Sequence, residues 1–300
     1  MKQRLLSIII VSYNTRKLLE DCLNSLYRNN KGISFEVIVV DSDSGDDSVA
    51  VIKKLQDKYP RLTLLPLSQN IGFGPANNYG ARHATGKFLL FLNPDTLVPA
   101  GTLKKALAIA SSATKLGVYS CKLKNIDGTT QSNGGYFPTL RRLFLWQTFF
   151  DDLPGIKQKL KSVHPPASYY SKTRSLDWVT GAFMLIPKSV FETVGGFDPD
   201  IFMYVEDTEL CYRIKKLGLK VIYSSTPHII HLGGGSSYSG WGLLKEAEMM
   251  VYFFRRHKGA LAAFLAKRII KFGALLRLVL FTFLPKHASK TKIYRQIMAL

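Results

Sequence analysis

The feature that most constrains the fold is an alternation of short apolar runs with helical patterns. Two continuous β-branched runs, LSIIIVSYN and FEVIVVDSDSGDDS, end in Ser, Asn, Asp or Gly. The segment between them repeats apolar residues at helical spacing, at Leu18, Leu19, Cys22, Leu23 and Leu26. Because continuous apolar strands are buried on both faces, this order predicts parallel strands joined by crossover helices.

The alternation continues along the first hundred residues. We expect a helix over Val49–Leu55, a strand in RLTLLPL, a helix over Pro75–His83 and a strand in KFLLFLNPDT. The sequence therefore predicts an α/β fold with an open, doubly wound, mostly parallel sheet.

The pattern changes after Leu97. We expect a helix over Leu103–Ala110, a strand in GVYSCKL, a polar connection over Asp151–Arg174, a single strand in SLDWVTGAFMLIP and a helix that starts in KSVFETVGGF. From Leu243 the pattern is helical to the end.

Positive charge is concentrated near the C-terminus. The chain has 41 basic and 21 acidic residues, and the segment from Lys245 to Leu300 holds 12 of the basic and 2 of the acidic ones. A helical projection places Leu261, Leu265, Phe272, Leu276 and Phe283 on one face, Lys267 and Lys271 opposite, and Arg268 and Arg277 on the flanks. This pattern predicts an amphipathic helix at an anionic membrane surface. The alternative is a helix packed on the domain with its basic face in water.

Other features bear on the compartment. Cys22, Cys121 and Cys211 are far apart, which indicates reduced thiols in a cytosolic protein. The start, MKQRLLSIIIVSYN, has the look of a signal peptide, but no small-residue cleavage site follows its apolar run, so we interpret it as a buried strand. No stretch has the ~20 uninterrupted apolar residues of a transmembrane helix.

Polar residues follow the predicted strands. Ligands of parallel sheets bind beyond the carboxyl ends of the strands, so three groups should converge: Ser12-Tyr13-Asn14, Asp41-Ser42-Asp43-Ser44 and Asn93-Pro94-Asp95. No GxGxxG or P-loop motif follows the first strand, which argues against dinucleotide oxidoreductases and P-loop enzymes. Asp41 could contact a nucleotide base or ribose, although on spacing alone a cap on the next helix is the favoured interpretation.

The stretch QNIGFGPANNYG is a Gly-rich turn into a helix. Backbone N–H groups exposed there could receive a phosphate. Asn70, Gly72 and Asn78 are the candidate residues, although all three could also serve the turn itself.

The stretch LLFLNPD is more specific. Asn93 and Asp95 lie two residues apart on one side of a strand end, where an amide oxygen and a carboxylate suit Mg²⁺ or Mn²⁺ bound to a diphosphate. His231, in HIIHLGGGSS, is a candidate for a further ligand. A lone His before glycines is also an ordinary structural residue.

Glu206 and Asp207 precede a helical pattern. The helix dipole favours acids at that position, so helix capping explains them. The preceding GGFDPDIFMY adds apolar surroundings, in which a carboxylate is a better base. A structural and a catalytic role both stay open on this evidence.

The combined motifs resemble, in order and spacing, the family 2 glycosyltransferases, specifically the bacterial rhamnosyltransferase-like branch. They are SIIIVSYN, VVDSDSGDDS, NIGFGPANNYG, FLLFLNPDT, DWVTGAFMLIP, GGFDPDIFMYVEDTELCYRIKKLG and HLGGGSS, spread over about residues 5–240. The resemblance implies a GT-A fold, an inverting mechanism, a nucleotide-sugar donor and a divalent metal, Mg²⁺ or Mn²⁺. Ser42, Asn93 and Glu209 stand where the family more often has Asn, Asp and Asp.

The resemblance also implies roles for single residues. Asp207 would be the base, with Glu206 orienting the acceptor, and Asp95 and His231 would hold the metal. Asp41 would contact the pyrimidine base. The remaining donor-binding residues would be Ser12, Tyr13, Ser44, Asn70, Gly72, Asn78 and Asn93, and the acceptor-facing residues Trp178, Gly181 and Tyr204.

The function expected from the resemblance is rhamnose transfer from a dTDP-linked donor to a polyprenyl-diphosphate-linked glycan in cell-surface polysaccharide synthesis. UDP-linked hexoses, including galactofuranose, are the alternative donors. The protein would lie on the cytoplasmic face of the bacterial cell membrane. Residues 1–240 would form the GT-A domain, with a nucleotide-sugar half at 1–98 and an acceptor half at 99–240, and residues 241–300 a basic helical membrane-associating segment.

Two rival functions come from other classes. The net charge of +20 prompts nucleic-acid binding. However, the chain has no reader motif, and its basic residues are interleaved with aliphatic side chains instead of stacking aromatic ones, so we expect no nucleic-acid partner. A non-catalytic sugar-nucleotide-binding subunit is the second rival, against which the intact Asp95 and Asp207 count.

Overall fold

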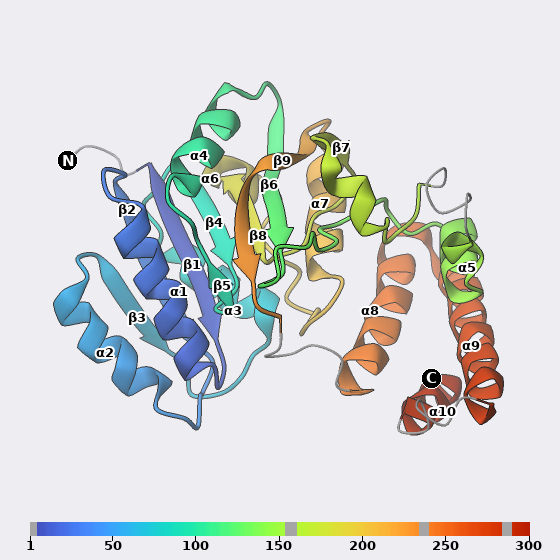
Figure 1. Ribbon diagram of the computed structural model, residues 1–300. Coiled ribbons are helices and arrows are strands. Elements are labelled where there is room, and N and C mark those ends of the chain that lie inside the picture. Colours follow the sequence, from blue (N-terminus) through green and yellow to red (C-terminus); the bar gives the residue numbers. More distant parts are fainter. Residues whose placement is uncertain (1–4, 154–160, 234–239, 284–289) are drawn as a thin grey trace. The chain divides into compact units, whose positions relative to one another are not determined.

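The computed structural model describes residues 5–153, 161–233, 240–283 and 290–300 (Figure 1). These residues form two compact units. The sheet unit comprises 5–134, 167–202 and 206–233. The helical unit comprises 135–153, 161–166, 203–205, 240–283 and 290–300.

The first half of the sheet unit has the predicted alternation. Its elements are β1 (Leu6–Ser12), α1 (Arg16–Asn29), β2 (Phe35–Asp41), α2 (Ser48–Lys58), β3 (Leu62–Pro66), α3 (Phe73–Arg82) and β4 (Phe88–Leu92). The strands lie in the order β3-β2-β1-β4 and are all parallel (Figure 1). Every residue of β1 and β2 is buried, as continuous apolar strands in such a sheet require. The predicted α/β fold class is therefore confirmed.

The second half of the sheet mixes directions. It adds β5 (Thr96–Leu97), α4 (Thr102–Ser112), β6 (Leu116–Lys124), η2 (Ala167–Ser171), β7 (Arg174–Leu176), β8 (Phe183–Pro187), α6 (Lys188–Thr193), α7 (Glu206–Lys216) and β9 (Lys220–His231). Strand β8 pairs antiparallel with both β4 and β6, while β6 and β9 are parallel. The order continues β4-β8-β6-β9-β5, and β7 pairs with β9.

The prediction of one strand in SLDWVTGAFMLIP is wrong. The segment forms two strands, β7 and β8, which pair with different neighbours. Between them Asp177 binds Lys215 of α7, and the N–H of Gly181 points to Asp207. Because these groups bond to α7, the intervening backbone leaves the sheet.

Strand β9 has no counterpart among the predicted elements. Its apolar ends are separated by Ser224, Ser225, Thr226 and Pro227, which hide the strand pattern. Opposite this stretch the register with β6 shifts between Cys121 and Lys122. The irregularity accommodates the polar residues without ending the strand.

Helices cover both faces of the sheet. Helices α1, α2 and α4 contribute to the core cluster on one face, together with the alternate residues Leu6, Ile8 and Ile10 of β1. On the opposite face Gly80 of α3 lies against Ile9 and Val40, so closely that no Cβ would fit. Phe191 of α6 packs on Phe91 of β4 on that same face. The sheet is therefore doubly wound, as predicted.

The helical unit contains α5 (Leu140–Gln147), η1 (Phe150–Asp152), α8 (Gly240–Lys258), α9 (Ala260–Thr282) and α10 (Thr291–Ala299). The predicted C-terminal helical pattern is thus divided among three helices, with Gly259 at φ +91° between α8 and α9. Helix α9 packs against α5, α8 and α10. No helix in the described ranges is long and apolar enough to cross a bilayer.

Candidate active site

The polar strand ends converge at one edge of the sheet. Strands β1, β2 and β4 are neighbouring parallel strands, so their carboxyl ends meet there. Strand β8 runs the other way and begins at that edge, where its first residue Phe183 pairs with Leu92. The N–H of Asn93 donates to the carbonyl of Ala182 over 3.3 Å, which ties the end of β4 to the residues before β8.

Asp41 ends β2 directly beside Ser12 of β1. It is buried, and its two carboxylate oxygens accept hydrogen bonds from the N–H and the hydroxyl of Ser44, at 3.0 and 2.8 Å. Tyr13, by contrast, is half exposed. Ser12, Asp41 and Ser44, all predicted to bind the donor, are therefore close together. Asp41 also shapes the turn that follows it.

The Gly-rich turn before α3 is held by its own residues. The side-chain oxygen of Asn70 accepts from the N–H of Gly72 at 3.0 Å. Gly72 has φ +91°, and a Cβ there would overlap the carbonyl of Phe202. The N–H of Phe73 donates to that same carbonyl over 2.8 Å. Glycine is thus required at position 72 by both the backbone angle and the close approach.

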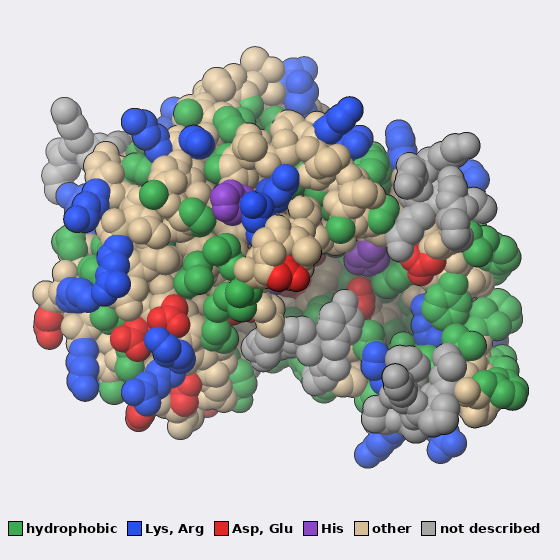
Figure 2. Space-filling model, in the orientation of Figure 1, with side chains coloured by type: hydrophobic (Ala, Val, Ile, Leu, Met, Phe, Trp, Pro, Cys, Tyr) green, Lys and Arg blue, Asp and Glu red, His purple; other side chains and the backbone are tan. Residues whose placement is uncertain are grey.

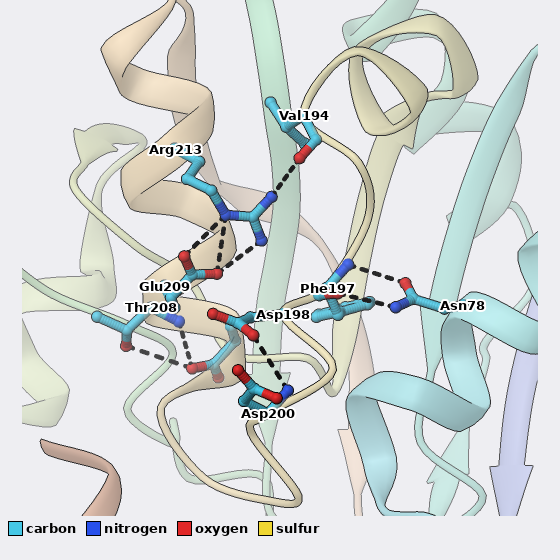
Figure 3. A network of polar contacts seen from close by, with 9 residues as sticks. Asn78, Val194, Phe197, Asp198, Asp200, Thr208, Glu209 and Arg213 are labelled. Atoms are coloured by element: carbon cyan, nitrogen blue, oxygen red, sulfur yellow. Dashed lines mark hydrogen bonds and ion pairs between the residues drawn. The ribbon is translucent and has the colours of Figure 1, made fainter. Parts of the chain in front are cut away.

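Asn78 connects α3 to the segment that precedes α7. Its side-chain amide donates to the carbonyl of Phe197 and accepts from the N–H of the same residue, both at 2.8 Å (Figure 3). The Asn78 amide thus makes the same pair of hydrogen bonds to Phe197 that a neighbouring strand would make. It fixes the loop that runs through Asp198 and Asp200 toward the acids of α7.

Asp95 and His231 meet across the pairing of β5 with β9. Thr96, next to Asp95, pairs with His231, and the N–H of Leu232 donates to the carbonyl of Asp95. The distance from Asp95 Oδ1 to His231 Nε2 is 3.3 Å. The amide nitrogen of Asn93 lies 3.4 Å from the same imidazole nitrogen. All three residues predicted for the metal end of the site are therefore brought together.

The pair of Asp95 and His231 fits a divalent cation. Asp95 Oδ1 is a buried oxygen with no hydrogen-bond partner within the described parts of the chain. Neighbouring oxygen ligands of an octahedral Mg²⁺ are about 3 Å apart, close to the 3.3 Å seen here. No cluster of three or more His, Cys, Asp or Glu with metal-binding geometry occurs among the described residues. A substrate or water could supply further ligands.

Asp207 lies in the first turn of α7 and is partly buried. Its Oδ1 accepts from the N–H of Thr208 at 2.6 Å, and its Oδ2 accepts from the N–H of Gly181 at 3.3 Å. Burial raises the pKa of Asp207 to about 6, while the N–H groups of Thr208 and Gly181 oppose the shift. Since Ala182 bonds to Asn93, residues 181 and 182 link Asp207 to the Asp95 end of the site.

Glu206 is the second acid of this turn and is buried. Its Oε2 has no hydrogen-bond partner within the described ranges. Burial, and after it the charge of Asp207, raises the pKa of Glu206 to about 8. These two adjacent carboxyl groups therefore hold a proton near neutral pH.

The backbone that leads into this pair is strained. Tyr204 and Val205 have φ values of +68° and +69°. Such angles are uncommon for any side chain and rarest for a β-branched one. Within the helical unit the Tyr204 ring lies against Gly242, where a Cβ would overlap its hydroxyl, and 6.3 Å from the ring of Trp241. The third acceptor-facing candidate, Trp178, is buried.

Glu209 is structural. It is fully buried and accepts three hydrogen bonds from the guanidinium of Arg213, at 2.6 to 3.0 Å (Figure 3). Arg213 also donates to the carbonyl of Val194 at 2.5 Å. This ion pair anchors the middle of α7 to the turn after α6, which leaves Glu206 and Asp207 as the acids at the helix start.

Residues 7–175, more than half of the chain, match the family model described as glycosyl transferase family 2. The chain belongs to glycosyl transferase family 2. The resemblance inferred from its motifs is therefore confirmed.

Three curated proteins illustrate the relationship of this glycosyl transferase to others. The O-antigen biosynthesis protein RfbC of Myxococcus xanthus is 28% identical over 226 residues, which are 75% of this chain but only 17% of that protein. The N-acetylglucosaminyl-diphospho-decaprenol L-rhamnosyltransferase of Mycobacterium tuberculosis is 25% identical over 75% of both chains. The rhamnosyltransferase WbbL of Escherichia coli K12 is 29% identical over 75% of this chain and 82% of its own.

A solved structure has the same fold as this transferase. The mannosyltransferase PcManGT from Pyrobaculum calidifontis, in complex with GDP-Man and Mn²⁺, matches with a TM-score of 0.58 and 18% identity. The match covers 100% of this chain and 86% of the mannosyltransferase. The predicted GT-A fold is thereby confirmed.

Sequence reasoning missed residues that support the site of this transferase from a distance. Gln131 bonds to His231, 100 positions later, and Arg213 neutralises Glu209. An i, i+4 Glu–Arg spacing could have suggested the second pair. Nothing local marks Gln131, because its partner is brought to it only by the pairing of β6 with β9.

Proposed function

We propose that this glycosyltransferase is inverting and moves a sugar from a nucleoside-diphosphate donor to a hydroxyl of a lipid-linked glycan, for cell-surface polysaccharide synthesis. Rhamnose from a dTDP-linked donor is the preferred substrate, because two of the relatives are named rhamnosyltransferases and one of these names a diphospho-decaprenol acceptor. A UDP-linked hexose or galactofuranose is the alternative donor.

The observation that carries the proposal is the environment of Asp207. A general base must be unprotonated yet basic enough to take a proton near neutral pH. Burial gives Asp207 a raised pKa, while Gly181 and Thr208 hold both of its oxygens in place. The neighbouring Glu206 keeps its proton to higher pH and can donate a hydrogen bond to the acceptor.

The proposed reaction is a single displacement. The acceptor hydroxyl gives its proton to Asp207, and its oxygen forms a bond to the anomeric carbon. The bond from that carbon to the diphosphate oxygen breaks, and the nucleoside diphosphate leaves with the electron pair. Because attack and departure occur on opposite faces, the anomeric configuration inverts.

Asp95 and His231 are the residues that would hold a divalent cation, Mg²⁺ or Mn²⁺. When bound, such a cation would offset the negative charge that grows on the departing diphosphate. The unpartnered Asp95 oxygen and the nearby imidazole nitrogen support this assignment. The structural neighbour that holds GDP-Man and Mn²⁺ supports a divalent metal in general.

The donor would lie along the strand ends. Asp41, with Ser12, Tyr13 and Ser44, would face the base and ribose at the ends of β1 and β2. Asn70 and Gly72 would shape the turn into α3 beside the phosphates, since the N–H of Gly72 is bonded to Asn70, and Asn93 would lie at the metal end. Asn78 contributes through the loop that it clamps to Phe197.

Helix α9 supports a location on a membrane surface. The side chains that it buries are small apart from Ile270, namely Ala263, Ala266, Gly273 and Ala274. It exposes large apolar ones: Leu261, Phe264, Leu265, Phe272, Leu275, Val279, Leu280 and Phe283. Figure 2 shows hydrophobic side chains gathered at the right-hand edge, over α5 and α9. A face of this kind, exposed in the described part of its unit, suits the interface of a bilayer.

Charge favours an anionic bilayer as the partner. Helix α9 contains Lys267, Arg268 and Lys271 and no acidic residue, and Arg255, Arg256 and Lys258 end α8. The fourth basic residue of α9, Arg277, instead donates to the carbonyl of Gln147. Basic side chains beside an apolar face are the usual composition of interfacial helices on anionic lipids. We therefore place the protein on the inner face of the cell membrane, where polyprenyl-linked acceptors are also found.

The direct test is a transfer assay. The full chain would be incubated with Mn²⁺, a polyprenyl-diphosphate-linked N-acetylglucosamine acceptor and, in separate reactions, dTDP-rhamnose, UDP-galactofuranose, UDP-glucose and GDP-mannose. We expect product with dTDP-rhamnose first, with inverted anomeric configuration. Retained configuration, or no product with any donor, would sink the proposal. The relatives and the structural neighbour named above are glycosyltransferases or polysaccharide biosynthesis proteins, so the nucleic-acid alternative gains no support.

A further inference from the structure

We propose that Gln131 is a positioning residue for the candidate metal site: it fixes the tautomer and orientation of His231, so that the Nε2 lone pair faces Asp95. The inference rests on the proposed function, because it assigns the imidazole to a metal. It concerns a residue that lies outside the motifs that carry the family resemblance.

The argument begins at Asp127, in the turn after β6. The hydroxyl of Thr129 donates to Asp127 Oδ1 at 2.6 Å, and the N–H of Thr129 donates to the same oxygen at 2.9 Å. These hydrogen bonds lower the pKa of Asp127. The carboxylate therefore acts only as an acceptor, and the one proton of the Thr129 hydroxyl is used on it.

The direction of the next bond follows from this. Asn125 lies 2.7 Å from the Thr129 hydroxyl oxygen, which now has only lone pairs to offer. The amide nitrogen of Asn125 must therefore point to Thr129, and its carbonyl oxygen to the other side. That oxygen lies 2.5 Å from Gln131 Nε2 and accepts a hydrogen bond from it.

The orientation of the Gln131 amide in turn decides which nitrogen of His231 carries the proton. Its Nε2 also donates to the backbone carbonyl of His231 at 2.8 Å, and a carbonyl can only accept. Both amide protons of Gln131 are thus used, and its Oε1 is left facing His231 Nδ1 at 2.8 Å. An oxygen with no proton accepts only from N–H, so Nδ1 carries the proton and Nε2 carries the lone pair.

The outcome is an arrangement that favours a cation. In this tautomer His231 Nε2 is an acceptor, and it lies 3.3 Å from the buried, unpartnered Oδ1 of Asp95. The amide nitrogen of Asn93 is 3.4 Å from Nε2 and can offer it only a long hydrogen bond, so the repulsion between the two acceptors still favours a cation between them. Metal-bound histidines elsewhere have their other ring nitrogen bound to an oxygen acceptor, which fixes the ring and strengthens the ligand. Gln131 Oε1 is such an acceptor.

The backbone keeps this chain of hydrogen bonds in register. The N–H of Asn125 donates to the carbonyl of Thr129 at 2.9 Å, and the N–H of Gln131 donates to Leu123 at 2.9 Å. Gly128, at φ +82°, closes the turn. The hairpin of residues 125–131 is therefore a preformed support that reaches from β6 to the end of β9.

The first experiment reads the tautomer in metal-free protein. Two-bond ¹H–¹⁵N NMR on ¹⁵N-histidine-labelled protein, assigned with His231→Gln, distinguishes a protonated Nδ1 from a protonated Nε2. We expect the wild type to hold the proton on Nδ1 and Gln131→Met to lose that preference. Gln131→Glu keeps an acceptor for Nδ1 and should retain it. An unchanged signal in Gln131→Met would overturn the inference.

The second experiment measures Mn²⁺ affinity in the presence of dTDP, by electron paramagnetic resonance. Loss of an outer-shell partner typically weakens metal binding by about 10- to 100-fold, and we expect Gln131→Met to fall in that range. The matched control is Gln56→Met, since Gln56 also donates to a backbone carbonyl, that of Leu62, but lies on α2. Thermal unfolding checks that each variant is folded.

The two experiments separate the two proposals. A wild type that binds no Mn²⁺ with dTDP contradicts the proposed metal site, whereas the tautomer still decides the role of Gln131. A wild type that binds Mn²⁺, with Gln131→Met binding equally well, contradicts the positioning role alone.

Discussion

The carboxyl-end edge of the sheet and the outer face of α9 are built on opposite rules. At the sheet edge, Asp95 is buried beside the ring of His231, and the partly buried Asp207 accepts a hydrogen bond from a backbone N–H group. On α9, Phe264 and Phe272 are about half exposed, while Ala266 is buried. Each arrangement is unfavourable in a protein that works alone in water. The comparison indicates that each surface would suit a partner, a polar one at the sheet edge and an apolar one at α9.

The largest expected effect breaks the polar side of this comparison. Asp207→Asn keeps the shape of the side chain but removes the proton acceptor, so turnover should fall by about 100-fold or more. Donor affinity should stay within a few-fold of the wild type, because the proposed donor residues are untouched. Single-turnover transfer and equilibrium titration with dTDP-rhamnose measure the two quantities.

The control for this prediction is Asp57→Asn, on the exposed face of α2. It should leave both quantities unchanged. Near-normal turnover in Asp207→Asn would dismiss Asp207 as the base, and equal losses of turnover and donor affinity would indicate a structural role.

The next effect sharpens the apolar side. Replacing both Phe264 and Phe272 by Ser removes two half-exposed rings from α9. Complete burial of one such ring contributes about 1.5–3 kcal/mol, so losing two partial contributions should weaken vesicle binding by about 10-fold or more. Co-sedimentation with phosphatidylglycerol-containing vesicles measures the change, and phosphatidylcholine vesicles test the need for anionic lipid.

Ile126→Ser is the matched control for α9. Ile126 is 76% exposed, but it lies in the sheet unit. It should not alter vesicle binding. Should the α9 variant bind vesicles normally, or change from a dimer to a monomer by light scattering, the exposed face would serve a second copy of the chain instead of lipid.

The smallest effect concerns stability and returns to the acids of α7. The pKa of Glu206 is raised from 4.5 to about 8 in the folded chain. The folded form thus holds the Glu206 proton more tightly than the unfolded chain does. This contributes stability that is fully present below pH 4.5 and is lost as the pH rises through about 8. Glu206→Gln removes this dependence. The difference between the Tm of the variant and that of the wild type should therefore shift in favour of the variant, by about 3 °C or more, between pH 5 and pH 8.5.

Differential scanning calorimetry at the two pH values measures this shift. Glu192→Gln, which alters a largely exposed acid of α6, should show the same Tm difference at both. A Glu206→Gln variant that behaves like this control would mean that the acid is ionised, and paired, in the folded protein.

Much of the fold could be predicted from local sequence. The strands β1, β2 and β4 are continuous apolar runs, and their polar ends define the edge where Asp41 and Asn93 lie. The motifs also predicted that Asp95 and His231 would lie close together, and the two side chains are 3.3 Å apart. The break before β8 and the whole of β9 were not foreseen, because their course depends on Asp177, Gly181 and the irregular pairing with β6. No local pattern reports such long-range bonds.

The left-handed backbone at Tyr204 and Val205 limits how this protein can be improved. Each such residue typically adds 1–3 kcal/mol of strain, held in place only by its surroundings. A glycine at 205 would relieve part of this strain, but it would also remove a buried Val side chain and leave the start of α7 freer to move. Selection for thermal stability therefore gains little at this position, and the strained backbone before Glu206 and Asp207 is retained.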